Sequence, residues 1–505
     1  MKIINLIKKH YFLPTLLIFS FVAKFITVFP NTFSFNFDQG KDSLAILHML
    51  KTFSLKFIGP WTSISGLYFG PAWYYLLAPG YLLTNGNPLS AVVTMIILNL
   101  ITIYLAYKYF GKITAVFFAT TPLWAIISTS AWNPFPMPLL MLIILINLRN
   151  EKLKSKNIAM IMLSASLSFH FSSAYAFFYL LIIPLIIIYR ILRFKQKIDL
   201  KFISAGIIAF IIPFIPQLLF EVKNHFVETK AIINYLQHPP ENQFIIPFSQ
   251  VVKSGLSEMT LAFLPEAINF LVLNKILHLL SFLFLAIAIY YVIKNKKEKF
   301  NWEYLLFIII PLIGFSKLHF NIWYVYAMAP IFVIFVGKLV KNLPKFMQII
   351  FILMLFITPV FQVYHYFNFA KNDIQHGRQA LPIKEKAITK IRQLSQGKAF
   401  ASYHYVPDIY DFSYNYLYLW QAFNGQKLPT EFAYEPGKID YIPEKLELLA
   451  ALKQTNQKPE YIFYIVESPE NPDFLRDWWN HQNYKEIIYE EKLSETVMLY
   501  QALPK

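Results

Sequence analysis

Two acidic residues near the N-terminus have a spacing that suits them to joint chemistry. Asp38 and Asp42 follow the first long apolar run of the chain and stand four positions apart. On a helix that begins there, positions i and i+4 lie on one side, so we expect both carboxylates on the same face of that helix. A carboxylate among aromatic side chains at a membrane surface is partly desolvated, which strengthens it as a base for a hydroxyl proton. A helix N-cap or a solvated interface residue is the structural alternative.

Aromatic residues next to proline supply candidates for binding a sugar. Gly70-Pro71 precedes Tyr74-Tyr75, and Ala131-Trp132-Asn133-Pro134 lies between two later apolar runs. An Asn side chain can hydrogen-bond a sugar hydroxyl, and a Trp ring can lie against a sugar ring. Trp132 and Asn133 are therefore candidate substrate-binding residues, or else an interface anchor followed by a helix-breaking turn.

Two polar segments carry basic residues suited to a phosphate. Ser316-Lys317-Leu318-His319 precedes Tyr324, and Glu221-Val222-Lys223-Asn224-His225 opens a second segment. A Lys ammonium meets a phosphate as a point charge, and a His ring can add a hydrogen bond. For Lys317, a side chain that reaches from a membrane span to the interface is the structural alternative.

The elements that must position these residues are membrane spans. Of the 505 residues, 56% are hydrophobic, and the mean hydropathy is +0.44. These values exceed those of soluble domains, whereas a bilayer supplies an apolar solvent. The net charge of +17 gathers in short basic clusters between apolar runs. The positive-inside bias and anionic lipid account for that charge, so membrane lipids are expected partners and nucleic acid is not.

Basic clusters decide which apolar runs cross the membrane. Runs long enough for about 30 Å of hydrocarbon lie near 11–30, 89–107, 113–130, 157–171, 172–189, 202–220, 273–293, 321–337 and 346–364. Shorter runs lie at 71–84, 137–148 and 302–316. Four basic clusters should face the cytoplasm together with the N-terminus, and they begin at Arg149, Arg190, Lys294 and Lys338. This is possible only if the segment 71–84 does not cross the membrane. The charge pattern thus predicts about eleven spans and places 71–84 in the outer interface.

An odd number of spans from a cytoplasmic N-terminus puts the C-terminal segment outside the cell membrane. We expect a transmembrane domain over 1–364, with outer loops at 31–88 and 221–272, and an extracytoplasmic domain over 365–505. The patterns of the second domain predict helices over 384–396 and 474–481, strands over 398–406 and 461–466, and a closing strand pair over 484–492 and 496–502. This combination predicts a small mixed α/β domain.

Asp38, Gly70-Pro71 and Tyr74-Tyr75 together resemble the first outer loop of the GT-C glycosyltransferases. The resemblance is to the protein O-mannosyltransferases and the aminoarabinose transferases, which depend on dolichyl- or polyprenyl-phosphate sugars. It covers the membrane region by layout and short patches by residue. It implies a mainly α, polytopic membrane fold and an inverting hexosyl or pentosyl transfer. The donor is then a co-substrate, and neither a metal nor another cofactor is expected, since the chain has no Cys and no metal-ligand spacing.

This resemblance also implies a role for each candidate residue. Asp38 would remove the acceptor proton, with Asp42 assisting. The donor phosphate would meet Lys317, His319, Lys223 and Tyr324, and the substrates would meet Trp132, Asn133, Tyr74, Glu221 and His225. The acceptor would be a glycan, lipid or protein hydroxyl of the cell envelope, at the outer face of the plasma (inner) membrane.

Three other functions stay open. A transporter or flippase of lipid-linked sugars would show paired repeats and charges deep in several spans, and this sequence has few deep charges. A structural or assembly subunit would tolerate exchange of the first-loop acids. An oligosaccharide ligase or polymerase with a diphosphate-linked donor would use two cationic anchors, which Lys223 and Lys317 could supply.

Overall fold

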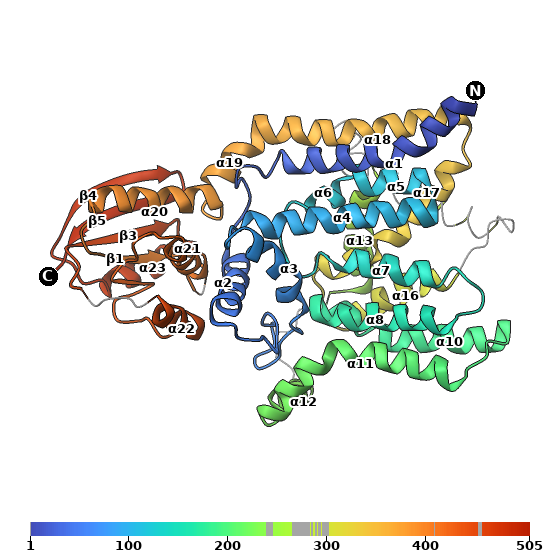
Figure 1. Ribbon diagram of the computed structural model, residues 1–505, viewed down its shortest axis with the longest axis horizontal. Coiled ribbons are helices and arrows are strands. Elements are labelled where there is room, and N and C mark those ends of the chain that lie inside the picture. Colours follow the sequence, from blue (N-terminus) through green and yellow to red (C-terminus); the bar gives the residue numbers. More distant parts are fainter. Residues whose placement is uncertain are drawn as a thin grey trace. The chain divides into compact units, whose positions relative to one another are not determined.

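A computed structural model describes residues 2–238, 246–264, 302–408, 410–452 and 457–505, with Leu283, Ala286, Ile287, Tyr290 and Lys294. These residues are mostly helical, with one five-stranded sheet near the C-terminus, which confirms the expected mainly α chain with a small C-terminal α/β segment (Figure 1). The chain divides into two compact units. The helical unit comprises Met1–Phe25, Lys56–Trp73 and Met95–Val363, and the sheet unit comprises Ile26–Leu55, Tyr74–Thr94 and Tyr364–Lys505.

Within the described ranges, five helical segments are long and apolar enough to cross a membrane. They are Leu89–Phe110 (α4), Ser173–Phe194 (α9, Ser173–Ala176, and α10, Tyr179–Phe194), Leu200–Lys223 (α11), Ile322–Lys341 (η2, Ile322–Met328, and α17, Ala329–Lys341) and Lys345–Asn368 (α18, Lys345–His365, and part of η3, Tyr366–Ala370). Shorter apolar helices are Tyr11–Phe25 within α1 (Lys2–Phe25), α7 (Met137–Asn147) and α16 (Glu303–Phe315). The span predicted over 273–293 lies largely outside the described residues, and the number of eleven stays a prediction.

The predicted span 113–130 is interrupted. Helix α5 (Lys112–Thr120) stops at Thr121, whose backbone is extended, and α6 (Pro122–Ile126) begins at the following proline. A residue before proline is driven away from helical dihedrals by the proline ring, so the break follows from the sequence.

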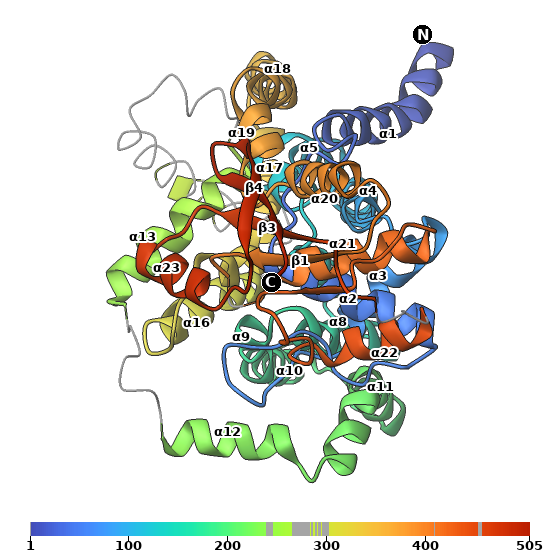
Figure 2. The same cartoon turned by 90° about the vertical axis from the view of Figure 1, so that its left-hand side faces the viewer.

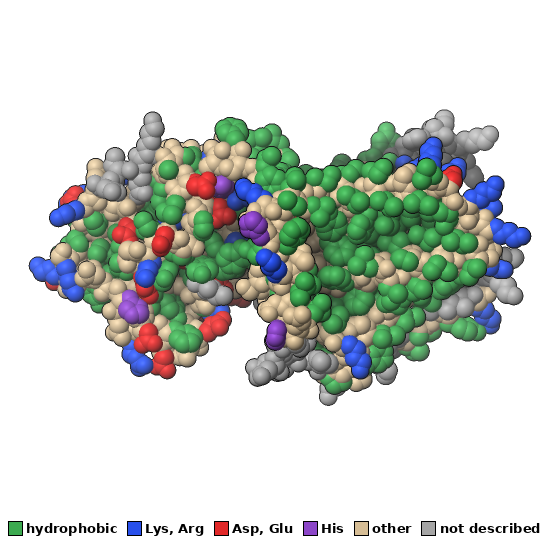
Figure 3. Space-filling view, turned by 90° about the horizontal axis from the view of Figure 1, so that it is seen from below, with side chains coloured by type: hydrophobic (Ala, Val, Ile, Leu, Met, Phe, Trp, Pro, Cys, Tyr) green, Lys and Arg blue, Asp and Glu red, His purple; other side chains and the backbone are tan. Residues whose placement is uncertain are grey.

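Hydrophobic side chains cover the outside of the helical unit. Ile207, Ile211 and Ile215 of α11 are exposed, as are Ile350 and Leu353 of α18. Figure 3 shows a broad continuous surface of hydrophobic side chains, with Lys and Arg gathered at one end. An apolar surface of this extent is stable in lipid and unfavourable in water. The chain is therefore a multi-pass membrane protein.

The described ranges contain further helices. They are α2 (Phe37–Thr52), α3 (Ala72–Leu83), α8 (Ser155–Phe171), α12 (Val227–Gln237), α13 (Phe248–Met259), η1 (Thr260–Ala262) and α19 (Lys371–His376). Arg190, which belongs to a predicted cytoplasmic basic cluster, is buried and pairs with Glu303 of α16 at 2.5 Å. Burying a guanidinium without a counter-charge lowers the stability of the folded state. This ion pair therefore holds α10 against α16.

The sheet of the C-terminal segment has the strand order β2-β1-β3-β5-β4. Its strands are β1 (Phe400–Tyr405), β2 (Glu431–Ala433), β3 (Tyr461–Glu467), β4 (Glu486–Ser494) and β5 (Val497–Leu503). β1 runs parallel to β2 and β3, and β5 is antiparallel to both β3 and β4. The strands predicted from the sequence are all present, including the closing pair, whereas β2 was not predicted.

Helices cover both faces of this sheet (Figure 2). On one face, Trp478 of α23 (Pro472–Asn480) packs with Tyr403 and Tyr464. On the other face lie α20 (Leu381–Ser395) and α21 (Phe412–Phe423), and α22 (Pro443–Ala451) follows in the chain. α2, from the predicted first outer loop, packs against α21 and α22. The sequence thus predicts α20 and α23 correctly and misses α21 and α22.

Candidate functional site

The N-terminus of α2 is held by a reciprocal set of hydrogen bonds. The Asn36 side chain accepts from the Asp38 backbone N–H at 3.0 Å, and the Gln39 side chain accepts from the Asn36 N–H at 3.1 Å. Such a capping box satisfies donors that the helix leaves unpaired. Asp38 therefore occupies a fixed backbone position in the first turn of α2.

The Asp38 carboxylate lies beside two sources of positive charge. Its Oδ1 is 3.1 Å from Nζ of Lys41, and the partial charge of the helix N-terminus adds to this attraction. Lys41 also lies 5.1 Å from the ring centre of Phe37. The Asp38 side chain is 41% exposed and that of Lys41 is 9% exposed, so the acid is reachable while its partner is held in the protein.

Asp42 has a different environment from Asp38, although it lies one turn further on. It is 5% exposed, and its neighbours include Tyr74 and Tyr81 of α3. Burial, followed by the negative charge of Asp42, raises the pKa of Tyr74 well above its usual value. The two carboxylates therefore differ in exposure, because α21 and α3 enclose this side of α2 beyond its first turn.

A glycine sets how closely α2 approaches α21. A Cβ on Gly40 would lie 2.5 Å from the backbone nitrogen of Ser413 and 2.8 Å from the carbonyl carbon of Phe412. Such distances are far below van der Waals contact, so only glycine fits here. Phe37 and Phe412 meet edge to face beside this contact, with ring centres 5.1 Å apart. α21 thus fixes the first turn of α2, which carries Asp38.

Asp408 is a second carboxylate near Asp38 that the sequence reasoning missed. It lies in the loop between β1 and α21. Partial desolvation raises its pKa, Lys384 and Arg378 oppose this increase, and the negative charge of Asp38 adds to it. Arg378 is itself held by the Ser468 carbonyl and the Glu470 carboxylate, both at 3.0 Å. The available signal was its place just after a predicted strand, where parallel sheets often carry functional loops.

In the helical unit, Glu221 has a structural role. Its carboxylate accepts from the backbone N–H groups of Glu228 at 2.8 Å and Thr229 at 3.0 Å, and from the Thr229 hydroxyl at 2.6 Å. These bonds cap the first turn of α12. Lys223, predicted to contact phosphate, is exposed at the end of α11, and His225, predicted to contact substrate, is exposed in the turn that follows.

Glu228 connects α12 to the segment around Tyr68. Its Oε1 accepts from the Tyr68 backbone N–H and from Nε2 of Gln217, both at 3.0 Å. Gln217 also donates to the Tyr68 carbonyl at 3.2 Å. Burial raises the pKa of Glu228 to about 7, against the opposing effect of these hydrogen bonds.

Asn133 and Trp132 lie in packed surroundings. Nδ2 of Asn133, which is 8% exposed, donates to the Phe171 carbonyl at 2.8 Å. The Trp132 ring centre is 5.1 Å from that of Trp323 and 5.5 Å from that of Phe135. Asn133 thus ties two segments together, and Trp132 belongs to an aromatic cluster.

The predicted phosphate ligands near Lys317 are partly brought together. Nδ2 of Asn321 lies 3.2 Å from both Nε2 of His319 and the hydroxyl of Tyr324. Lys317 is exposed two positions before His319. Asn321, which the sequence analysis did not single out, therefore aligns two of the candidate ligands.

Over the described ranges, no group of three or more His, Asp and Glu side chains could hold a metal ion. In the sheet unit the structure gathers Asp38, Asp42 and Tyr74, and in the helical unit it gathers His319 and Tyr324.

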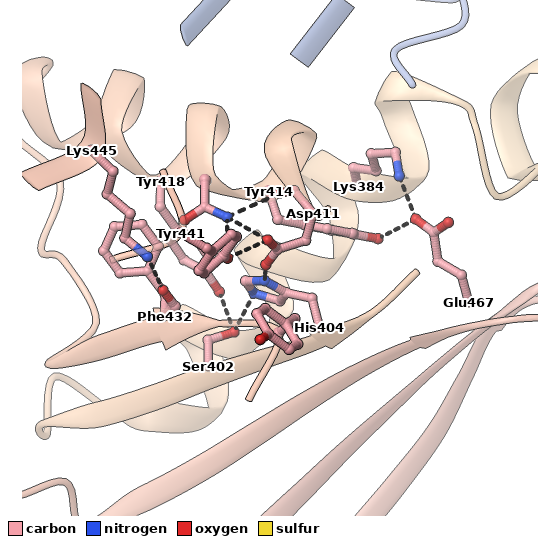
Figure 4. A network of polar contacts seen from close by, with 12 residues as sticks. Lys384, Ser402, His404, Asp411, Tyr414, Tyr418, Phe432, Tyr441, Lys445 and Glu467 are labelled. Carbon is pink, nitrogen blue, oxygen red and sulfur yellow. Dashed lines mark hydrogen bonds and ion pairs between the residues drawn. The ribbon is translucent and has the colours of Figure 1, made fainter. Parts of the chain in front are cut away.

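A buried Ser-His-Asp arrangement lies in the sheet unit (Figure 4). The Ser402 hydroxyl is 3.0 Å from Nε2 of His404, and Nδ1 of His404 is 2.5 Å from Asp411. This order matches a hydrolytic triad. However, the three side chains are at most 1% exposed, and the Ser402 Oγ accepts from the Tyr418 hydroxyl at 2.9 Å. The arrangement therefore stabilises the core and is closed to a substrate.

Comparison with known proteins reveals similarity at the level of the fold. No protein-family model and no curated protein matches the sequence. The structure matches ArnT from Cupriavidus metallidurans bound to undecaprenyl phosphate over 97% of each chain, with a TM-score of 0.61 and 9% identity. The apo state of that protein also matches over 97% of each chain, with a TM-score of 0.57 and 10% identity. The expected resemblance to the GT-C aminoarabinose transferases is confirmed for the fold.

Proposed function

We propose that this chain, which has the GT-C fold of ArnT, transfers a sugar from a polyprenyl phosphate to a hydroxyl acceptor. The observation that carries the proposal is the position of Asp38. Its carboxylate is exposed on a capped helix and is held by Lys41. The chain matches, over 97% of each chain, the structure of a protein solved with undecaprenyl phosphate. Transfer inverts the anomeric carbon and takes place at the outer face of the plasma membrane, with the N-terminus in the cytoplasm.

Asp38 acts as the general base. The acceptor oxygen attacks the anomeric carbon opposite the phosphate, and its proton passes to an Asp38 carboxylate oxygen. The bond between that carbon and the phosphate oxygen breaks, and the electron pair leaves with the lipid phosphate. Lys41 holds the carboxylate in one orientation, which reduces the ordering required during the reaction.

Buried residues of α2 fix the position of the helix that carries Asp38. Asp42 lies among Tyr74 and Tyr81 and acts through the position of α2 rather than on the acceptor. Gly40 keeps α2 against α21. Asp408 adds a second carboxylate near Asp38, which can accept a hydrogen bond from a sugar hydroxyl.

Cationic and hydrogen-bonding groups of the helical unit receive the leaving phosphate. Lys317 and Lys223 are exposed and can meet its developing charge, while His319 and Tyr324 supply hydrogen bonds. Residues 1–364 form the catalytic transmembrane domain, and residues 365–505 form an extracytoplasmic domain that contacts the acceptor. The acceptor is a glycan, lipid or protein hydroxyl, and the reaction uses no further cofactor.

The decisive variant is D38N in lipid nanodiscs. Its amide keeps the shape of the carboxylate but cannot take the proton, so transfer from a radiolabelled polyprenyl-phosphate sugar to a membrane-extract acceptor should fall by about 10²–10⁴. D473N is the matched control, because Asp473 is 65% exposed on α23 and pairs only locally with Arg476. Both variants should keep the wild-type melting temperature. Full turnover by a folded D38N protein would rule out Asp38 as the base.

A further inference from the structure

The sheet unit contains a polar pocket of about 720 Å³ that has no place in the proposed transfer reaction. It lies between the loop that precedes α4, helix α20 and the C-terminal end of α21. Its lining consists of Thr84, Asn85, Asn87, Thr389, Arg392, Gln393, Trp420, Gln421, Asn424 and Gln426. The size is that of a site for a small molecule or a short oligosaccharide.

The chemistry of this lining is selective. Six of these ten residues carry side-chain amides, two carry hydroxyls, one is aromatic and one is charged. Amides both donate and accept hydrogen bonds, as do the hydroxyls of a sugar. The lining contains no aliphatic side chain and no carboxylate. It is therefore suited to a polyhydroxylated ligand, neutral or negative.

The aromatic wall of the pocket is held in place before any ligand binds. Nε1 of Trp420 donates to the Asn85 carbonyl at 2.8 Å, and Nδ2 of Asn424 donates to the same carbonyl at 3.2 Å. The Tyr416 ring lies nearly parallel to the indole, at 8° and 6.3 Å between centres. A Cβ on Gly86 would lie 2.6 Å from Cδ1 of Trp420, so the loop closes tightly on the ring. Such preorganisation lowers the entropic cost of binding.

Arg392 has unused hydrogen-bonding capacity. Its Nη1 donates to Oε1 of Gln421, another lining residue. Its Nε and Nη2 are buried and make no hydrogen bond to any residue that the structure describes. These two nitrogens form the parallel donor pair that matches a carboxylate or phosphate. Burial also lowers the pKa of this guanidinium, as expected for a cation that lacks a counter-charge.

We propose that this pocket binds an acidic saccharide, with the sugar ring against Trp420 and its anionic group on Arg392. The pocket is distinct from the Asp38 site. Trp420 lies seven positions beyond Ser413, the residue in contact with Gly40, which is about 10 Å along α21. The bound saccharide is a glycan segment remote from the reacting hydroxyl. This inference does not require the transferase activity, because binding is measurable without a donor.

Direct binding to the full chain in nanodiscs tests the proposal. The probe is a tetragalacturonate, and its fully methyl-esterified form is the neutral comparison, both followed by saturation-transfer NMR and calorimetry. The wild type should bind the acid form more tightly. R392Q should bind it about tenfold more weakly, the effect of losing one charge-assisted contact, and should no longer distinguish the two forms. R476Q, which removes a 71% exposed arginine on α23, should bind like the wild type.

Additional variants keep the test decisive. If R392Q does not fold, the double variant Q393A/Q426A truncates two exposed amides of the lining and should weaken both saccharides. D38N should bind as the wild type does, which separates this proposal from the catalytic one. Absence of binding by the wild type, or an equal loss in R392Q and R476Q, would overturn the assignment.

Discussion

Gly40 of α2 and Ser413 of α21 come so close that a methyl group on Gly40 would lie 2.5 Å from the Ser413 nitrogen. This contact fixes the helix that carries Asp38 against a helix more than 370 positions later in the chain. Because the obstacle is backbone, neither helix can yield without moving as a whole.

The variant G40A should separate α2 from α21. Overpacking at a rigid contact costs about 1–3 kcal/mol, so the melting temperature in detergent should fall, and transfer should fall with it as Asp38 is displaced. In G206A, the added methyl group would meet only flexible side chains, at 3.3 Å or more, and it should melt like the wild type. A G40A protein with unchanged stability and transfer would contradict the role of this contact.

Stability of the helical unit should depend on Glu228. Burial raises the pKa of its carboxyl from 4.5 to about 7, so the folded state holds the proton more tightly than the unfolded state. The contribution of Glu228 to the free energy of unfolding therefore falls as pH rises from about 4.5 to 7, and it stays constant above that range. E228Q keeps the acceptor oxygen for Tyr68 and cannot ionise.

Thermal unfolding at two pH values provides the measurement. E228Q should match the wild type at pH 4 and exceed it in melting temperature at pH 8. E151Q, at an exposed position of the same unit, should show the wild-type pH dependence. Parallel profiles for the wild type and E228Q would show that Glu228 is not the titrating group.

The buried ion pair of Lys384 and Glu467 should contribute far more to stability than the partly exposed pair that Lys390 of the same helix makes with Glu491. Both side chains are 3% exposed, and Tyr414 donates to Glu467 at 2.9 Å. K384M leaves a carboxylate buried without its cation and should destabilise the sheet unit by about 3–5 kcal/mol. K390M removes a pair that is about 30% exposed and should cost less than about 1 kcal/mol. Chemical denaturation followed by tryptophan fluorescence distinguishes the two, and equal costs would contradict the assignment.

Ser402 should be inert despite its hydrolase-like partners. Because Ser402, His404 and Asp411 are at most 1% exposed, a fluorophosphonate probe should not label the native protein. S402A should lower stability through loss of the bonds to His404 and Tyr418 while leaving transfer intact. Labelling that S402A abolishes would reveal an access route and a hydrolytic activity.

The sequence by itself determined the features that depend on local pattern. Hydropathy identified the membrane-spanning character, since a run of apolar residues needs lipid wherever it lies. Alternation and helical periodicity located α20, α23 and four of the five strands. The position of Asp38 after the first apolar run, with the proline and aromatic residues that follow, was enough to suggest the GT-C fold.

Only the tertiary structure decided which residues are reachable and which are enclosed. Asp38 and Asp42 share a spacing, yet α21 and α3 leave one exposed and bury the other. α21 is rich in aromatic residues that favour strands, and its packing on α2 makes it a helix. Glu221, a predicted substrate ligand, caps α12, while Arg392 carried no local signal and Asp408 only its position after a predicted strand. Burial and partnership arise from contacts between distant parts of the chain, which no local pattern records.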